Sequence, residues 1–315
     1  MVDNKQRGEQ ALDSLKKELA ARDRKESSTP WKIAALSAAV LIAAGGGIYY
    51  LARQGDEGSV SATGESSASS TAEATTSEAA PAEPLALARA TALPATVTCS
   101  YPASTSAASK DAGTPPTENI AATGTATVKL DTSAGAIGME LDRSVSPCTV
   151  NAIEYLAGKG YFDDSVCHRL TTSEGLKVLQ CGDPSGTGSG GPGFQFANEY
   201  PTDEALDKID TSTLPEGISE KEANSYTSQL LQYSGSVTYP RGTIAMANAG
   251  LGTNGSQFFL NYGDSTLPPL YTYFGKINDE GLATLDAIAQ KGAEGGTADG
   301  APAEEVRIRT ATVSG

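Results

Sequence analysis

The residues best suited to chemistry lie in one stretch, 242–260, where two short apolar runs flank a glycine-rich loop. The first run passes into the small residues of 247–249, and the second lies beside Gln257 and contains Phe259. Small side chains next to an aromatic ring leave space for an apolar pocket, and amide groups supply polar contacts at its rim. A plain hairpin with buried aromatic residues does not require so many small residues. The stretch therefore favours a shallow binding groove.

Other catalytic classes find little support in the chain. His168 is the only histidine among 315 residues, which argues against a multi-histidine metal site and leaves a triad-type hydrolase one candidate base. No Gly-x-Ser-x-Gly motif is present, so a hydrolase is a distant alternative. Gly186, Gly188 and Gly191 match a dinucleotide-binding string, but Gly193 and aromatic residues follow where an apolar helix should begin. We therefore expect neither a metal nor a cofactor.

The charge of the chain limits its partners. It carries 23 basic and 38 acidic residues, a net charge of −15. A nucleic-acid-binding protein needs a basic face, so we expect no nucleic-acid partner. The acidic excess is explained by solubility.

Three ordered blocks resemble the signature of the cyclophilins, a family of peptidyl-prolyl cis–trans isomerases. These blocks are the stretch 242–260, the run Cys167-His168-Arg169, and the run 180–184. The Leu-Gln-Cys-Gly-Asp-Pro sequence at 179–184 is typical of actinobacterial members. The resemblance covers residues 123–312. It implies a mainly β fold: a closed eight-stranded antiparallel barrel with one helix over each open end.

The resemblance also implies roles for individual residues. Arg169 would donate to the prolyl nitrogen as the X–Pro amide twists, and Gln180 would bind the substrate backbone and help to place Arg169. His168 would support catalysis. Phe259 would form the base of the proline socket. The remaining residues expected to contact a proline-containing polypeptide are Val178, Met246, Ala247, Asn248, Ala249, Gln257, Leu270 and Tyr271.

This chain departs from the family pattern near the expected socket. Ten residues separate Arg169 from Gln180, and Lys177 stands where a phenylalanine is usual. Tyr271 falls about where the family has a histidine, and the only tryptophan is Trp31, far from this segment. A proline-binding or chaperone module with weak catalysis is therefore the alternative to an isomerase.

Hydrophobic periodicity predicts the elements that must position these residues. We expect a polar insertion at 201–237 that contains one helix. The predicted strands and helices are a hairpin of 125–130 and 138–141, a helix at 147–158, strands within 162–170 and 176–181, a helix at 220–232, a helix at 281–290 and a closing strand at 306–309.

The N-terminal part predicts a membrane anchor. Residues 33–51 carry no charge, and nineteen residues of helix span about 28 Å, close to the thickness of a bilayer core. Eight basic residues precede this run and only Arg53 follows closely, so the N-terminus should be cytoplasmic and the rest extracytoplasmic. A cleaved signal peptide is the alternative. The predicted organisation is a cytoplasmic segment 1–30, a single transmembrane helix 31–52, a disordered linker 53–93, an extension 94–122 and an isomerase domain 123–315. We expect the protein to be a monomer.

The chain has four cysteines, all beyond the predicted anchor. We expect two disulfides in an oxidising compartment, with zinc as a distant competitor, and four cysteines allow three connectivities. Cys167 and Cys181 lie on consecutive strands where they could face each other. The pair Cys99–Cys148 remains, and it would pin the extension to the first helix.

Overall fold

The computed structural model describes residues 82–212, 214–215 and 217–314. These residues form one compact unit that begins at Ala82. The predicted cytoplasmic segment 1–30, the transmembrane helix 31–52 and linker residues 53–81 lie outside the described residues. Within the part of the chain that is described, no helix has the length and apolar character needed to cross a bilayer.

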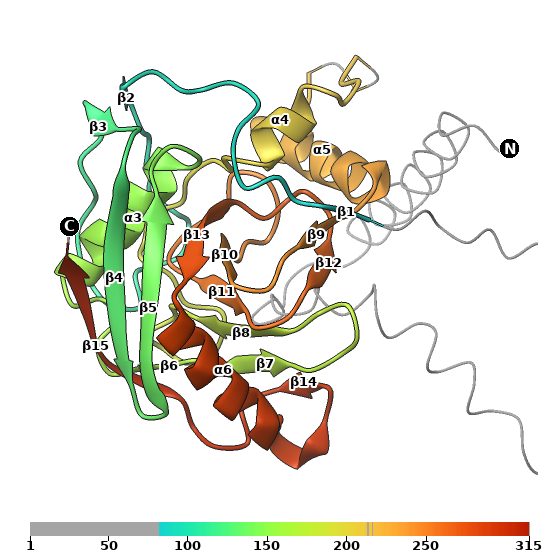
Figure 1. The fold of residues 1–315 in the computed structure, drawn as a ribbon. Helices are drawn as coiled ribbons and strands as arrows, with labels where there is room; N and C mark the ends of the chain where they lie inside the picture. Colours follow the sequence, from blue (N-terminus) through green and yellow to red (C-terminus); the bar gives the residue numbers. More distant parts are fainter. Residues whose placement is uncertain (1–81, 213, 216, 315) are drawn as a thin grey trace, which may run out of the picture. The chain divides into compact units, whose positions relative to one another are not determined.

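A single curled sheet of ten strands dominates the domain (Figure 1). The strand order is β14-β7-β8-β11-β10-β13-β5-β4-β15-β6, and each neighbouring pair is antiparallel. The predicted mainly β, antiparallel architecture is confirmed. The strands are β4 (Thr125–Thr132), β5 (Gly135–Asp142), β6 (Ser165–Val166), β7 (Arg169–Thr171), β8 (Val178–Cys181), β10 (Thr243–Met246), β11 (Phe258–Asn261), β13 (Tyr273–Ile277), β14 (Asp299–Gly300) and β15 (Arg307–Ser314).

The hairpin of β4 and β5 shows why this sequence forms sheet. Along β4, Ala126, Val128 and Leu130 are buried and the residues between them are more exposed, which is the alternation of a strand with one face in the core. Leu130 pairs with Ile137 of β5, and both side chains are fully buried. The predicted hairpin is confirmed.

Two helices pack against this sheet at the predicted places. Helix α3 (Pro147–Gly158) begins with proline in its first turn, where the missing N–H has no intrahelical partner to lose. Helix α6 (Asp279–Lys291) begins after Asn278, whose side chain accepts a hydrogen bond from the Gly281 N–H. Helix α3 contacts β4 and β15, and α6 contacts β5. A short 3₁₀ turn, η1 (Glu294–Gly296), follows α6.

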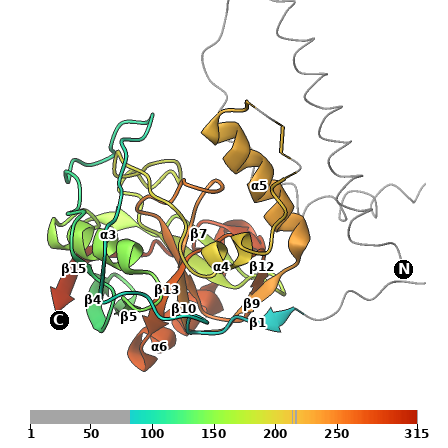
Figure 2. The same ribbon diagram turned by 90° about the horizontal axis from the view of Figure 1, so that it is seen from above.

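The insertion 201–237 contains two helices, α4 (Thr202–Leu206) and α5 (Glu220–Ser234). The predicted helix at 220–232 is α5, and it begins with a reciprocal capping box between Ser219 and Glu222. Leu231 of α5 lies in a small buried cluster with Leu251 and Leu270. Both helices lie on the side of the domain that carries β1, β9 and β12 (Figures 1 and 2).

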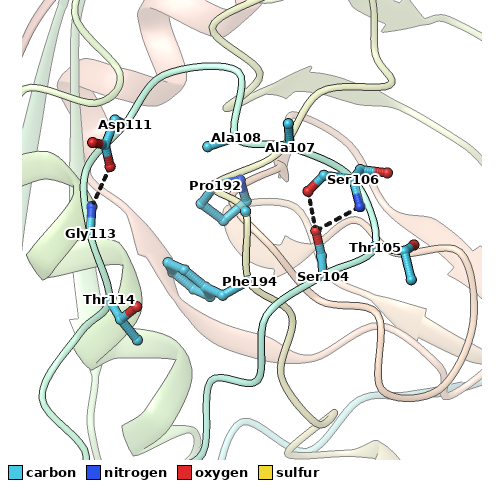
Figure 3. A pocket seen from close by; sticks show the side chains of 11 residues that line it. Ser104, Thr105, Ser106, Ala107, Ala108, Asp111, Gly113, Thr114, Pro192 and Phe194 are labelled. Atoms are coloured by element: carbon cyan, nitrogen blue, oxygen red, sulfur yellow. Dashed lines mark hydrogen bonds between the residues drawn. The ribbon is translucent and has the colours of Figure 1, made fainter.

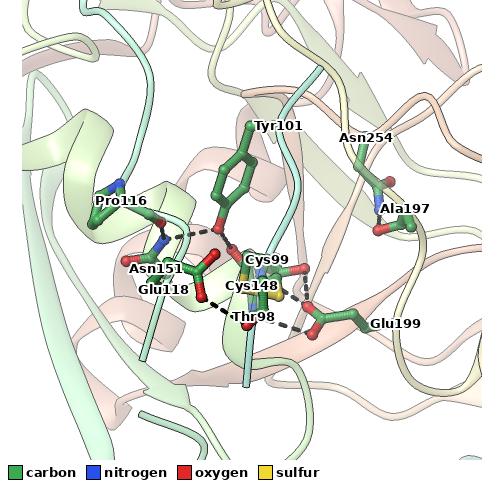
Figure 4. Close-up of a disulfide and its surroundings, with 11 residues drawn as sticks. Thr98, Cys99, Tyr101, Pro116, Glu118, Cys148, Asn151, Ala197, Glu199 and Asn254 are labelled. Carbon is green, nitrogen blue, oxygen red and sulfur yellow. Dashed lines mark hydrogen bonds between the residues drawn. A yellow bond between two sulfur atoms is a disulfide. The ribbon is translucent and has the colours of Figure 1, made fainter. Parts of the chain in front are cut away.

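The extension is fastened to helix α3, as predicted (Figure 4). Strands β2 (Thr96–Val97) and β3 (Ile120–Ala121) pair with each other, and the Cys99–Cys148 disulfide joins the extension to α3. The Tyr101 hydroxyl donates to the Cys148 carbonyl oxygen at 2.7 Å. Cys99, Tyr101 and Ile120 belong to the same buried core as the sheet. The second disulfide, Cys167–Cys181, is also the predicted pair.

The predicted boundary of the linker is wrong. Residues 82–93 were expected to be disordered, but β1 (Glu83–Pro84) pairs in parallel with β9 (Val237–Tyr239), which pairs with β12 (Ser265–Leu267). Leu85 is buried, and Arg89 forms an ion pair of 2.6 Å with Asp203. The leucines among the alanines of this segment supply apolar anchors, so the domain begins at Ala82 and not at 123.

Candidate active site

Four residues form a row across neighbouring strands. Arg169 of β7 lies opposite Gln180 of β8, Gln180 lies opposite Phe259 of β11, and Phe259 lies opposite Ala245 of β10. Residues directly opposite each other in a sheet point to the same face. The strand residues next to them, Leu170, Leu179, Phe258 and Ile244, belong to the interior core, so this row lies on the outward face.

A chain of hydrogen bonds runs from this row to the glycine loop. Arg169 Nη1 donates to Gln180 Oε1 at 3.3 Å, and Gln180 Nε2 donates to Gln257 Oε1 at 2.9 Å. Gln257 Nε2 donates to the carbonyl oxygens of Gly188 and Gly190, each at 2.9 Å. Arg169 and Gln180 are therefore in hydrogen-bond contact, and Gln257 connects Gln180 to the glycine loop.

Asp183 organises the glycine loop from within. Its carboxylate accepts hydrogen bonds from the N–H groups of Gly188 at 2.8 Å and Gly190 at 2.9 Å, and from Ser185. Burial raises the pKa of Asp183, but the hydrogen bonds from Ser185 and the backbone outweigh it and hold the pKa below its usual value. The loop that receives Gln257 is thus held by an ionised side chain.

Asp299 is a partner of Arg169 that sequence reasoning missed. Arg169 Nε donates to Asp299 Oδ1 at 2.8 Å, and Nη2 donates to Oδ2 at 2.7 Å. Such a bidentate contact fixes both the position and the plane of the guanidinium group. The hydrogen bonds that Arg169 donates to Asp299 raise the pKa of Arg169, so the arginine keeps its charge.

Aromatic rings surround Phe259. The ring of Tyr239 lies 6.4 Å away and that of Tyr271 lies 5.6 Å away, both edge-to-face, and Phe259 is 5% exposed. Tyr239 was not predicted to belong here, and its hydroxyl donates to the Tyr271 carbonyl oxygen at 2.7 Å. Val178 is buried in the same cluster, with Ala247 packed against it.

The structure does not bring Met246 and Leu270 to this face. Met246 lies opposite Phe258, and both are fully buried in the interior core, because their positions on β10 and β11 have the inward orientation. Leu270 packs in the cluster beneath α5, since the segment turns after two prolines. Leu267 packs against the Phe259 cluster instead, and sequence reasoning missed it.

Lys177 does not occupy the position of a socket residue. Its side chain is exposed, and its stem lies against Gly263, where an added Cβ would approach the Lys177 Cδ to 2.5 Å. The next residue, Val178, carries the apolar contact to the Phe259 cluster. The departure from the family pattern therefore removes an aromatic ring without placing a charge in the cluster.

The remaining predicted residues border the row. Asn248 is half-buried, and its Nδ2 donates to the Leu270 carbonyl oxygen at 2.9 Å. Ala249 is exposed, and its N–H donates to Thr253. His168 lies against the glycine loop, where a Cβ on Gly188 would approach its Cδ2 to 3.0 Å. Burial lowers the pKa of His168, so the side chain is neutral at pH 7.

A separate hollow of about 480 Å³ lies between the extension and the end of the glycine loop (Figure 3). Small and hydroxyl-bearing residues of 104–114 form one side, and Pro192 and Phe194 form the other. None of the residues predicted to bind substrate lines it. It is therefore distinct from the row on the outward face.

Comparison with known proteins identifies the family. The family described as "Cyclophilin type peptidyl-prolyl cis-trans isomerase/CLD" matches residues 127–313. The chain belongs to this family. The match includes every member of the row from Arg169 to Phe259, together with Asp299.

Two curated relatives have the same name, "Probable peptidyl-prolyl cis-trans isomerase B". The protein of Mycobacterium tuberculosis (strain CDC 1551 / Oshkosh) is 48% identical over 211 residues, which cover 67% of this chain and 62% of the relative. That of Mycobacterium leprae (strain TN) is 48% identical over 216 residues, which cover 68% of this chain and 66% of the relative. The match thus spans somewhat less than two thirds of each relative.

Solved structures give a weaker match. The cyclophilin type peptidyl-prolyl cis-trans isomerase of Cryptosporidium parvum has a TM-score of 0.43 and 26% identity, and the match covers 61% of this chain and 99% of that one. A second structure of the same protein, in the presence of the dipeptide Ala-Pro, has a TM-score of 0.42 with 26% identity and covers 60% and 99%.

Proposed function

We propose that this protein is a peptidyl-prolyl cis–trans isomerase that assists the folding of extracytoplasmic proteins. The observation that carries the proposal is the row in which Arg169 and Gln180 lie beside Phe259 on one face of the sheet. Family membership and the names of the relatives support it. Proline-containing polypeptides are the proposed substrates.

The chemistry requires only that a rotational barrier be lowered. Rotation about an amide is slow because the C–N bond has partial double-bond character, with a barrier of about 18–20 kcal/mol. At X–Pro bonds the two isomers differ by only about 0.5–1 kcal/mol, so a catalyst does not need to drive the equilibrium. As the amide twists, the nitrogen lone pair localises and becomes an acceptor. A fixed donor at this nitrogen stabilises the twisted amide more than the planar one.

Arg169 is the proposed donor. A guanidinium is permanently charged and has five N–H groups. Among the hydrogen bonds of the described residues, Asp299 accepts two and Gln180 accepts one. One N–H on Nη1 and one on Nη2 are left for the substrate. Gln180 would also bind the substrate backbone. His168, which lies against the glycine loop, would support the position of that loop.

Phe259 is the proposed base of the proline socket, with Val178 and Tyr271 at its sides and Leu267 in the place first given to Leu270. Ala247, Asn248, Ala249 and Gln257 would border the path of the polypeptide. Phe259 has little exposed surface, so proline binding would require part of the cluster around it to shift. The socket lacks the aromatic ring that Lys177 replaces, and burial of one aromatic ring is worth about 1.5–3 kcal/mol. We therefore propose weaker proline binding than a complete aromatic socket gives.

A second candidate function is a proline-binding or chaperone module with weak catalysis. The exposed side chain of Lys177 and the small exposed fraction of Phe259 favour it. Exchange NMR on a short X–Pro peptide separates the two functions, with the full-length chain and its Arg169→Ala variant. An isomerase speeds exchange, and the variant loses about a hundredfold or more of that rate. Line broadening without faster exchange in either protein supports the binding module and rejects the isomerase.

We also propose that the sheet closes into an eight-stranded barrel. Only Cys167 and His168 separate β6, which pairs with β15, from β7, which pairs with β8. The Cys167 N–H donates to the Val306 carbonyl oxygen at 2.8 Å, which continues the β6 pairing toward β7. If β6 and β7 are one strand and β14 is an added edge strand, eight strands remain. Slow amide hydrogen exchange across 165–171 is expected, and fast exchange at Cys167 opposes closure.

The proposed location is the cell membrane, with a single N-terminal helix at 31–52, a cytoplasmic N-terminus and an extracytoplasmic domain. The uncharged run 33–51 and the excess of basic residues before it support this orientation. The two disulfides fit an oxidising compartment. Protease added to intact cells should remove the domain and spare an N-terminal tag, and protection of the domain would oppose the proposal. A monomer is expected, and light scattering in detergent would test it.

A further inference from the structure

We propose that Asp299 is a positioning residue for Arg169, and that it sets the rate of isomerisation without contacting the substrate. This inference rests on the proposed function, in which Arg169 donates to the prolyl nitrogen. The carboxylate of Asp299 holds the Nε and Nη2 edge of the guanidinium through bonds of 2.8 and 2.7 Å. It thereby decides in which direction the remaining N–H groups point.

Asp299 holds the arginine more firmly than Gln180 does. The bond from Arg169 Nη1 to Gln180 is a single contact of 3.3 Å, longer than the usual range for N–H···O bonds. A single long contact leaves the guanidinium free to rotate about it. Two parallel bonds to a carboxylate remove that freedom, because both donors and both acceptors lie in one plane.

The backbone holds Asp299 in place. Strand β14 pairs with β7, and Asp299 lies opposite Thr171, two residues along the strand from Arg169. This makes Asp299 and Arg169 diagonal neighbours on one face, within reach of long side chains. The Thr172 N–H donates to the Ala298 carbonyl oxygen at 2.9 Å, and the Thr297 hydroxyl donates to the Asp299 carbonyl oxygen at 3.1 Å. The carboxylate therefore starts from a fixed point and is not on a free loop.

Orientation matters at this site because the donor must meet a nitrogen lone pair that exists only in the twisted amide. A long arginine side chain that samples many rotamers spends little time in the required geometry, and misplacement by an ångström can cost a large factor in rate. A positioning residue should therefore change kcat more than substrate affinity. Asp299 is a surface residue, 52% exposed, so its replacement is expected to leave the fold intact.

The test compares Asp299→Asn with a matched control in the full-length chain. Asp286 makes the same kind of contact with Arg241, with two bonds of 2.8 Å. The side chains of the two pairs are similarly exposed. The exposed fractions are 39% for Arg241 and 45% for Asp286, against 31% for Arg169 and 52% for Asp299. Exchange NMR on an X–Pro peptide gives kcat and KM, and a ¹⁵N spectrum follows the Nε–H signal of Arg169.

We expect Asp299→Asn to lower kcat about threefold to tenfold with KM unchanged. The Nε–H signal of Arg169 should broaden or exchange faster with water. Asp299→Glu should recover part of the rate, because a carboxylate is still available. Asp286→Asn should leave kcat, KM and the Arg169 signal unchanged.

The variants at Arg169 distinguish failure of the positioning role of Asp299 from failure of the proposed function. If Arg169→Lys lowers kcat and Asp299→Asn does not, the positioning role is overturned and the proposed function stands. A rise in KM with unchanged kcat in Asp299→Asn also overturns it, because that result indicates ordinary substrate binding. If neither Arg169→Ala nor Arg169→Lys changes the rate, the proposed function itself fails.

Discussion

The two faces of strands β7, β8, β11 and β10 differ in what they require of the sequence. On the inward face every residue is apolar and has no exposed surface: Leu170, Leu179, Phe258 and Ile244. On the outward face the neighbouring residues are Arg169, Gln180, Phe259 and Ala245. The inward face must fill space, whereas the outward face must leave donors and an aromatic ring within reach. A shift of one residue along the chain thus separates the residues of the core from those of the proposed site.

The segments before the sheet follow the same division. The extension adds Cys99, Tyr101 and Ile120 to the inward core. The earlier segment adds Leu85 to the outward cluster that contains Phe259. Both segments precede the first strand of the large sheet, yet one supports the core and the other borders the proposed socket. Variants in each should therefore give different defects.

The largest expected effect separates two adjacent residues of β8. Leu179→Ala removes a fully buried side chain from the inward core and should lower the free energy of unfolding by about 2–5 kcal/mol. Gln180→Ala should change stability much less but lower kcat, because Arg169 and Gln257 both lose a partner. Urea unfolding and exchange NMR measure the two quantities. Equal losses of stability in the two variants would contradict the division between faces.

The second prediction removes the Cys99–Cys148 disulfide with a Cys99→Ser, Cys148→Ser double variant. The bond closes a loop with a sequence separation of 49, and its loss should lower stability by about 2–4 kcal/mol. Activity per folded molecule should stay unchanged, because the extension belongs to the inward core. The matched double variant at Cys167 and Cys181 should lose activity as well, since these residues flank Arg169 and Gln180. Equal activity in both double variants would oppose this assignment.

The third prediction concerns Leu85 on the outward side. Leu85→Ala should lower the free energy of unfolding by less than Leu179→Ala does, because a terminal segment can detach as a unit. It should also raise KM for an X–Pro peptide about twofold to fivefold, since the cluster around Phe259 loses support. Ile120→Ala in the extension is the control, with reduced stability and unchanged KM. A KM change in the control alone would reverse the two roles.

Much of this arrangement could be predicted from the sequence, for physical reasons. Alternating residue types predicted the β4–β5 hairpin, start and stop signals predicted α3, and apolar residues at helical spacing predicted α6. The residues of the row were found through their short motifs, which local sequence preserves. The prediction that Met246 contacts the substrate is wrong, because it relied on proximity along the chain. Met246 is next to Ala245 in sequence, but it faces the interior with Phe258.

Other residues of the site could not be predicted, because no local sequence pattern marks them. Asp299 reaches Arg169 across 130 positions of sequence, from a polar glycine-containing segment in which no periodicity marks it. Tyr239 and Leu267 enter the cluster through the small sheet of β1, β9 and β12, whose pairing is non-local. Leu85 was hidden in an alanine-rich segment whose composition resembles a linker. In each case tertiary pairing decides the role of the residue.

The smallest predicted effect concerns pH and the only histidine. Burial is the main reason that the pKa of His168 is lowered; Asp183 raises it, and Arg169 lowers it further. Below about pH 6.5, the unfolded chain therefore binds a proton that the native state resists. The contribution of His168 to the free energy of unfolding should be constant above that pH and fall as the pH drops below it. His168→Gln should remove this part of the dependence.

Glu199 contributes a pH dependence of stability with the opposite sign, so it serves as a control for His168. Burial raises the pKa of this carboxyl at the start of α3, although bonds from Thr149 and Cys148 favour its charge. Its native form thus holds a proton more tightly than the unfolded chain does, and its contribution to stability is lost as the pH rises through the raised pKa. Urea unfolding between pH 5 and 8 should therefore show a slope that His168→Gln flattens and Glu199→Gln does not flatten. If the acid-side loss of stability survives in His168→Gln, the histidine beside the proposed site is not its source.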